Sequence, residues 1–165
     1  MIPRQIALPD GFHAAKAFNR EQWLTHVAVL LRPWFTARGF EIPLRIRLGV
    51  GSLSSTRKVL GVCHTWADRD GFRHITISPF IDDPLLVTVV LTHELIHAVL
   101  PEDEVHGRRF GQAARALGLL SPVTQPAAGP ELHDFLVDIV RRVGPYPHKA
   151  PALLANAVHA RARAC

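Results

Sequence analysis

The stretch His93-Glu94-Leu95-Ile96-His97 says more about this chain than any other five residues. On an α-helix, residues four apart project from one face, so His93 and His97 can direct two imidazole rings at one point. Two neutral imidazoles are two of the three protein ligands of a catalytic zinc site, and Glu94 stands beside them as a candidate general base. The alternative is an ordinary amphipathic helix that carries two histidines on its solvent side.

The motif lies in a strongly apolar run from Leu85 to Leu100. A charged side chain in such a run is costly unless it has a partner, and a metal ion would provide one. The run is long enough to suggest a membrane span, but the two histidines and Glu94 in its C-terminal half argue against that interpretation. We therefore expect no membrane association and a buried helix that binds metal.

Signals for the two ends of this helix flank the apolar run. Pro84 suits the first helical turn, and Asp83 or Asp82 can cap that turn. Pro101 cannot continue a helical ladder, so the helix should stop near it. The pattern therefore predicts one helix between these two prolines.

A third ligand has to follow this helix, because a catalytic zinc site takes three protein ligands and leaves one position open for water. His106 comes after a short loop that can fold back under the helix, and Gly107 allows a tight turn there. Glu104 and Asp103 are rivals, since carboxylates also bind zinc. We favour His106, because the acidic residues of this loop are equally suited to a solvated surface.

This pattern resembles the SprT-like zinc metallopeptidase family, which includes the Spartan-type proteases. The family has H-E-x-x-H, a loop, and then His-Gly-x-x-Phe or His-Gly-x-x-Trp, and this chain has His106-Gly107-Arg108-Arg109-Phe110. Residues 59–63 and 144–148 are also similar to family stretches. The resemblance covers about residues 20–148. It implies a zincin-like fold with Zn²⁺ as cofactor, Glu94 as general base and three metal ligands, His93, His97 and His106.

The resemblance is to bacterial and phage members that lack a C-terminal zinc ribbon. Many relatives build that ribbon on four cysteines, whereas this chain has only Cys63 and Cys165, far apart in sequence. Two distant cysteines indicate free thiols in a reducing compartment rather than a disulfide framework. The first twenty residues lack the apolar core of a signal peptide, so we expect a cytoplasmic protein.

The balance of charge bears on partners. A formal net charge of +5 and an isoelectric point near 10.0 favour a polyanion. Basic residues also occur in pairs, among them Arg57-Lys58, Arg108-Arg109 and Arg141-Arg142. Contact with DNA is what the resemblance implies. The alternative is a basic protein whose surface charge is scattered and forms no nucleic-acid site.

The remaining patterns predict an α+β fold in which a small antiparallel sheet packs against the metal helix. Alternation of apolar residues indicates a strand over 44–50, and residues 59–66 and 73–78 indicate two strands joined as a hairpin. Asn19 can cap a helix that begins near Arg20 and buries one apolar face. Further helices are expected over about 107–117 and from Pro130.

A length of 165 residues suits one domain with one core. We expect an N-terminal arm over 1–18, the metallopeptidase domain over 19–148 and a basic, alanine-rich tail over 149–165.

These features predict hydrolysis of peptide bonds in a protein substrate, with Glu94 taking the proton of a zinc-activated water. An oxyanion donor is also needed. Tyr146, His133 and His148 are available, but each is better explained by packing or surface position, so none is assigned. The alternative function is a zinc-stabilised module that binds DNA or protein without cleaving it. Glu94 favours the enzyme, since a structural zinc site needs no general base.

Overall fold

The computed structural model describes residues 18–51, 58–64, 66–102, 104–122 and 124–151. The predicted arm and tail lie outside the described residues, except for residues 18 and 149–151. Within the described ranges the elements are α1 (Arg20–Thr36), β1 (Ile46–Val50), β2 (Gly61–His64), β3 (Arg73–Ile77), α2 (Pro84–Val99), α3 (Arg108–Ala116) and α4 (Pro130–Val143).

The three strands form one sheet in the order β1-β3-β2. Strands β2 and β3 pair antiparallel, which confirms the predicted hairpin. Strand β1 runs parallel to β3, with Leu48 opposite Ile75, so the sheet is mixed and the prediction of an antiparallel sheet is wrong. The reason is topological. The chain reverses twice between β1 and β3, and β1 takes the free edge of β3 instead of pairing with β2.

The first predicted strand also begins later than expected. Leu44 is 88% exposed and precedes β1, although its position in the apolar alternation suggested an inward-facing residue. The Arg32 side chain donates hydrogen bonds to the carbonyl oxygens of Ile42 and Pro43, which ties this segment to α1 before pairing with β3 begins.

Helix α1 follows from local signals in the sequence. Asn19 and Gln22 form a reciprocal capping box, in which each side chain accepts from the backbone N–H of the other residue. The predicted apolar face is buried or packed against the core, and Gly39 adopts a positive φ of 82° just after the helix. The predicted beginning of this helix is confirmed, and the helix ends at Thr36.

Helix α2 lies at the centre of the fold. Asp83 caps it by accepting from the Leu86 N–H at 2.8 Å, and Pro84 occupies the first turn, as expected. Every residue from 87 to 98 is buried, because the sheet, α1, α3 and α4 all pack around this helix. A helix that is covered on all sides needs an apolar sequence all round, which explains the uninterrupted run.

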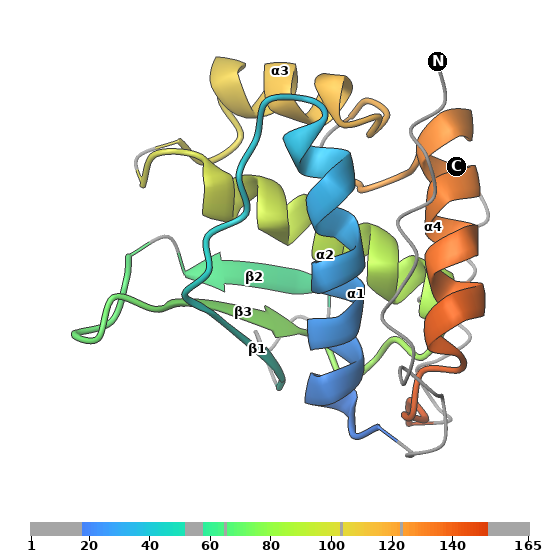
Figure 1. The fold of residues 1–165 in the computed structure, drawn as a ribbon. Coiled ribbons are helices and arrows are strands. Elements are labelled where there is room, and N and C mark those ends of the chain that lie inside the picture. Colours follow the sequence, from blue (N-terminus) through green and yellow to red (C-terminus); the bar gives the residue numbers. More distant parts are fainter. Residues whose placement is uncertain (1–17, 52–57, 65, 103, 123, 152–165) are drawn as a thin grey trace.

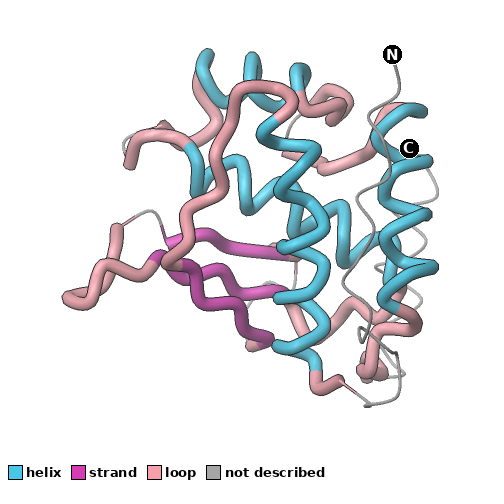
Figure 2. Tube along the Cα trace, viewed as in Figure 1, coloured by secondary structure: helices cyan, strands magenta, loops and turns pink. Residues whose placement is uncertain are grey.

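The helices and the strands occupy separate parts of the fold, as in other α+β proteins (Figures 1 and 2). Helix α1 contacts β1, while α2 contacts β2 and β3 on the face that carries Ile75 and Ile77. Helix α3 packs on α2, and α4 packs on both α1 and α2 (Figure 1). No helix in the described part of the chain is long and apolar enough to cross a membrane.

Candidate metal centre

Helix α2 buries His93, Glu94 and His97 within about one helical turn. His93 and Glu94 are each 5% exposed and His97 is 7% exposed. The four-residue spacing places both imidazoles on one face of the helix, as the motif predicted. These side chains are buried in the most apolar element of the chain, so they need either hydrogen-bond partners or a bound ion.

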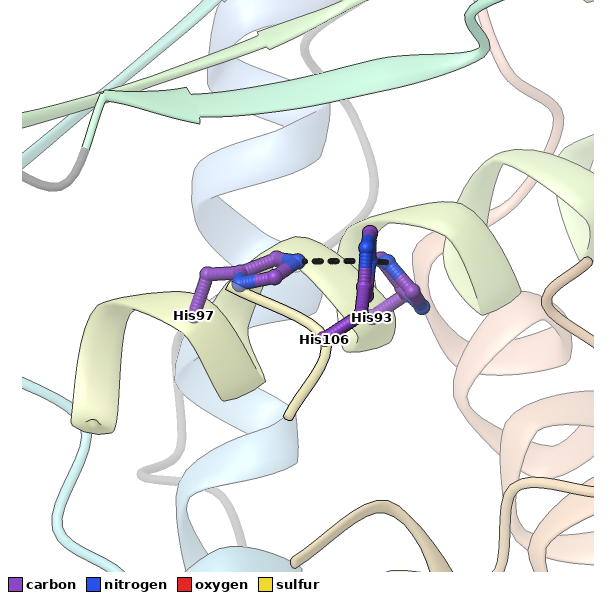
Figure 3. Close-up of side chains that lie close together, drawn as sticks. All are labelled: His93, His97 and His106. Carbon is purple, nitrogen blue, oxygen red and sulfur yellow. Dashed lines mark hydrogen bonds between the residues drawn. The ribbon is translucent and has the colours of Figure 1, made fainter. Parts of the chain in front are cut away.

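The loop after α2 brings His106 to the same point (Figure 3). The Nε2 atom of His106 lies 3.1 Å from Nε2 of His93 and 3.1 Å from Nε2 of His97. The ligand atoms of the three residues all lie within 4.8 Å of one another. The cluster that the sequence predicted is therefore assembled, with two members buried and His106 exposed.

Hydrogen bonds between the three imidazole rings explain the close approach of their Nε2 atoms poorly. A neutral imidazole offers one N–H and one lone pair, so Nε2 of His106 has a single site with which to meet two neighbouring nitrogens. A cation among three lone pairs would satisfy all of them together. In a tetrahedral zinc site the ligand nitrogens are separated by about 3.3 Å, close to the observed spacing. The three histidines could therefore hold a metal ion.

The environment of the histidines keeps them in the form that binds metal. Burial, together with the neighbouring histidines, lowers the pKa of His93 to about 3. Burial and the proximity of His106 lower the pKa of His97 to about 4. Both rings are therefore neutral at physiological pH, and only a neutral ring has a lone pair for a metal.

The outer ring nitrogens of the two buried histidines differ in their partners. His97 has a hydrogen bond to the Glu104 backbone. The Nδ1 atom of His93 is buried and has no hydrogen-bond partner among the described residues. Since a metal-binding histidine usually donates its second N–H to an acceptor, His97 is the better-oriented ligand of the two.

Phe110 forms the floor of the cluster. Its fully buried ring stacks on His97, with centroids 4.3 Å apart, and its centroid lies 4.9 Å from those of His93 and His106. An apolar ring in this place excludes water from one side of the three imidazoles and restricts their rotation. Phe110 is thus a structural member of the site, although it cannot bind a metal.

The structure also distinguishes between the candidates for the third ligand. The Glu104 carboxylate accepts hydrogen bonds from the backbone N–H groups of Arg109 and Phe110, at 3.0 and 3.3 Å. It thereby caps α3, whose own N-cap residue, Gly107, has no side chain to offer. Glu104 is not part of the three-residue cluster, and Asp103 lies outside the described residues.

The Glu94 side chain points towards strand β2. Burial raises the pKa of its carboxyl group to about 8, although a hydrogen bond from the Cys63 backbone opposes the shift. The metal-free site therefore keeps Glu94 protonated near neutral pH, whereas a nearby cation would favour the carboxylate. A carboxyl group whose charge depends on its neighbours is suited to accept and release a proton.

Arg73, at the start of β3, fastens the end of the metal helix to the sheet. Its guanidinium donates to the carbonyl oxygens of His97 and Leu100, at 3.4 and 3.2 Å. A cation is favourable there because the last carbonyl groups of a helix lack partners and carry partial negative charge. No local pattern in the sequence indicates this role of Arg73, since only the tertiary fold places β3 beside this helix end.

Other candidate residues have different environments. Burial and the Glu94 carboxylate raise the pKa of the Cys63 thiol to about 12, so it stays protonated and unreactive. Tyr146 packs on Trp23, and His148 bonds to the carbonyl oxygen of Pro79. His133 lies on α4 beside Asp134. Tyr146, His148 and His133 thus each have a packing, hydrogen-bond or surface contact away from the three histidines.

The site thus belongs to an α+β domain that carries a cluster of three histidines, two of them buried, with the buried carboxyl group of Glu94 on the same helix as His93 and His97. Comparisons with protein-family models, with curated proteins and with solved structures found no match to this chain. The function therefore has to be inferred from the chemistry of the site itself.

Proposed function

We propose that this chain is a zinc-dependent metallopeptidase of the zincin type, related to the SprT-like family, which hydrolyses peptide bonds in protein substrates. The observation that carries the proposal is the buried Glu94 carboxyl group on the same helix as two of three converging imidazoles. A site that only stabilised the fold would need the histidines and would gain nothing from a buried carboxyl group beside them.

The donor set favours zinc as the metal. Three imidazoles from a helix and the loop after it match the ligand type and number of catalytic zinc sites. When bound, zinc would supply Lewis-acid activation of a water molecule and polarisation of the scissile carbonyl. Glu94 would accept the proton of that water and deliver it to the leaving amine. Phe110 would exclude water from the floor of the site.

The zincin-like arrangement that we propose also accounts for the position of β2. This strand is an edge of the sheet and lies next to α2. Leu60 accepts from the Ser78 N–H, so in the antiparallel register the backbone groups of Gly61 and Cys63 point away from β3. An extended peptide could add to this edge as a further strand, beside the metal cluster, through the backbone groups of Gly61 and the Cys63 carbonyl oxygen, because the Cys63 N–H donates to Glu94.

The decisive experiment compares wild type with Glu94→Gln, which keeps the shape of the side chain and removes its ability to act as a base. We expect both proteins to bind one zinc per chain by elemental mass spectrometry. Cleavage of labelled casein should fall by about 10²- to 10⁴-fold in the variant. If Glu94→Gln cleaves casein as fast as wild type, the proposed mechanism is wrong.

The alternative is a zinc-stabilised module that binds DNA or protein without turnover. One observation favours a polyanionic partner. Arg108, Arg109 and Arg115 lie exposed on α3, and within the described ranges none of them has an ion pair. Binding of a DNA duplex should then weaken steeply with salt. An affinity that does not change with salt would remove a polyanionic partner, both for this alternative and for the enzyme.

The proposal includes a cytoplasmic location, because a reducing compartment would keep Cys63 in the free form found here.

A further inference from the structure

Strand β2 approaches the metal helix most closely at Gly61. A Cβ atom added at this position would lie 2.8 Å from both Cγ and Oε1 of Glu94, and 2.7 Å from Cγ1 of Val90. Carbon atoms in folded proteins do not come this close without displacing one another. The space that a side chain would occupy at residue 61 is therefore taken by the Glu94 side chain.

Cys63, two residues after Gly61, makes a second contact with the Glu94 carboxyl group. The backbone N–H of Cys63 donates a hydrogen bond to the Glu94 carboxyl group. This N–H is free to do so because, in the register of the hairpin, it points away from β3. Gly61 and Cys63 thus meet Glu94 from one strand, by close packing and by a hydrogen bond.

We propose that Gly61 and the backbone N–H of Cys63 position the Glu94 side chain, so that β2 sets the orientation of the general base. The proposal rests on the proposed function only for the name of that role, since the contacts exist whatever reaction follows. At these two positions the strand acts through the space left by the missing side chain of Gly61 and through the main-chain N–H of Cys63. Gly61 is a positioning residue, because it acts on the reaction through Glu94.

A competing explanation is that Gly61 serves packing alone. Val90 lies as close to position 61 as Glu94 does, so glycine could be needed only to let the sheet rest on α2. The two explanations make different predictions when the Val90 contact is removed. In the double variant Gly61→Ala/Val90→Ala, the contact with the helix wall is relieved while the contact with Glu94 persists.

The first experiment measures amide hydrogen exchange by NMR on the zinc-loaded protein and requires no activity. The Cys63 amide should be protected in wild type, although it lies at a sheet edge. It should exchange at least about tenfold faster in Glu94→Ala and in Gly61→Ala, because the hydrogen bond is lost in both. The Val62 amide is the matched control, because the register directs it to β3 and its protection should not change. If the Cys63 amide exchanges at the wild-type rate in both variants, the proposal is overturned.

The second experiment measures kinetics on a fluorogenic peptide taken from a casein cleavage site. Gly61→Ala should lower kcat by about 100-fold and leave KM and zinc content nearly unchanged, because a small displacement of a catalytic group is enough to slow the chemical step. The double variant should stay slow. In a Glu94→Gln background, Gly61→Ala should cost nothing further, since the base that it displaces is already inactive.

Recovery of kcat in the double variant would show that Gly61 serves packing, and would overturn the proposal. The two experiments also separate this proposal from the proposed function. Should wild type cleave no peptide at all, the metallopeptidase is refuted, while the exchange rates still decide whether β2 positions Glu94.

Discussion

Two groups of histidines lie in this small fold, and they differ in what surrounds them. His93, His97 and His106 meet one another through their Nε2 atoms, and two of them are buried. His64 and His74 face each other across the β2–β3 hairpin, and Nε2 of His74 lies 2.8 Å from the Asp68 carboxylate. Arg47 joins this second group by an ion pair to Asp68 at 3.4 Å.

The difference shows why one group is a candidate for a metal site and the other is not. Around His74 a carboxylate already satisfies the ring, and the partly exposed group can exchange with water at little cost. Around His93 and His97 no described carboxylate accepts a hydrogen bond from the rings, so their lone pairs converge without an ordinary partner. Composition alone does not show which of the ten histidines are candidate metal ligands. Their burial and their hydrogen-bond partners make that distinction.

The largest expected effect tests the comparison directly. His106→Ala removes the exposed member of the cluster, and His74→Ala removes a partly exposed histidine of the other group. We expect zinc affinity to fall by more than about 100-fold in His106→Ala, since changes even to residues behind the ligands cost 10- to 100-fold. Affinity in His74→Ala should match wild type.

Competition with a chromophoric chelator, with elemental mass spectrometry as a check, measures both affinities. Full zinc affinity in His106→Ala would mean that another residue is the third ligand, and the comparison between the two groups would lose its basis.

How well the sequence predicted these features depended on the distance along the chain over which each is encoded. Helix α2 carries its own cap, its own prolines and its own ligand spacing, so its bounds and the metal cluster could be predicted. The parallel pairing of β1 with β3 could not, because alternation of apolar residues specifies a strand and not its neighbour.

The environment of Glu94 also depends on residues that lie far apart in the sequence and could not be predicted from a local pattern. A glycine inside a strand is a general sign of a close backbone approach, so Gly61 offered a signal. Nothing local identifies what approaches it, because α2 lies more than twenty residues further along the chain. The role of Glu104 was missed for a similar reason, since only the fold shows that its carboxylate is occupied by the N-terminus of α3.

The second prediction concerns the stability of the metal-free protein. His93 and His97 have folded-state pKa values of about 3 and about 4, below the ordinary 6.5. Between the folded-state pKa values and 6.5, the unfolded chain binds more protons than the folded protein. Stability therefore falls as pH decreases below about 6.5, by about 1.4 kcal/mol per pH unit for each fully titrating group. The pKa of Glu94 is raised from 4.5 to about 8, so its contribution to stability falls as pH rises from 4.5 to about 8.

Urea denaturation of chelator-treated protein at about pH 5, 6.5 and 8 checks these opposite signs. Glu94→Gln should remove the loss on the alkaline side and steepen the loss on the acid side, because Glu94 opposes the histidines between pH 4.5 and 6.5. A wild-type curve without a maximum between these limits would show that the cluster is less buried than the structure indicates.

A smaller effect is expected at Glu104. Glu104→Gln keeps the shape of the side chain but weakens the acceptor that caps α3, so the free energy of unfolding should fall by about 1 kcal/mol. Zinc content should stay at the wild-type level, because the carboxylate faces Arg109 and Phe110 and not the three histidines. Loss of zinc together with stability would show instead that Glu104 is a ligand.

The smallest effect is expected in the hairpin group, where Asp68 accepts from the backbone N–H groups of Asp70 and Phe72 and pairs with His74 and Arg47. The hydrogen bond with His74, followed by that from Phe72, lowers the pKa of Asp68 to about 2. Its stabilising contribution is therefore present above the ordinary value of 3.8 and is lost as pH falls towards 2.

Asp68→Asn should lower Tm least of all these variants, with an effect that shrinks in high salt and leaves zinc content unchanged. Because the acid loss caused by His93 and His97 begins near pH 6.5, melting curves at about pH 3 and pH 6 separate the two groups. An Asp68→Asn effect on Tm that is as large at pH 3 as at pH 6 would show that the partners of Asp68 do not hold it in the ionised form.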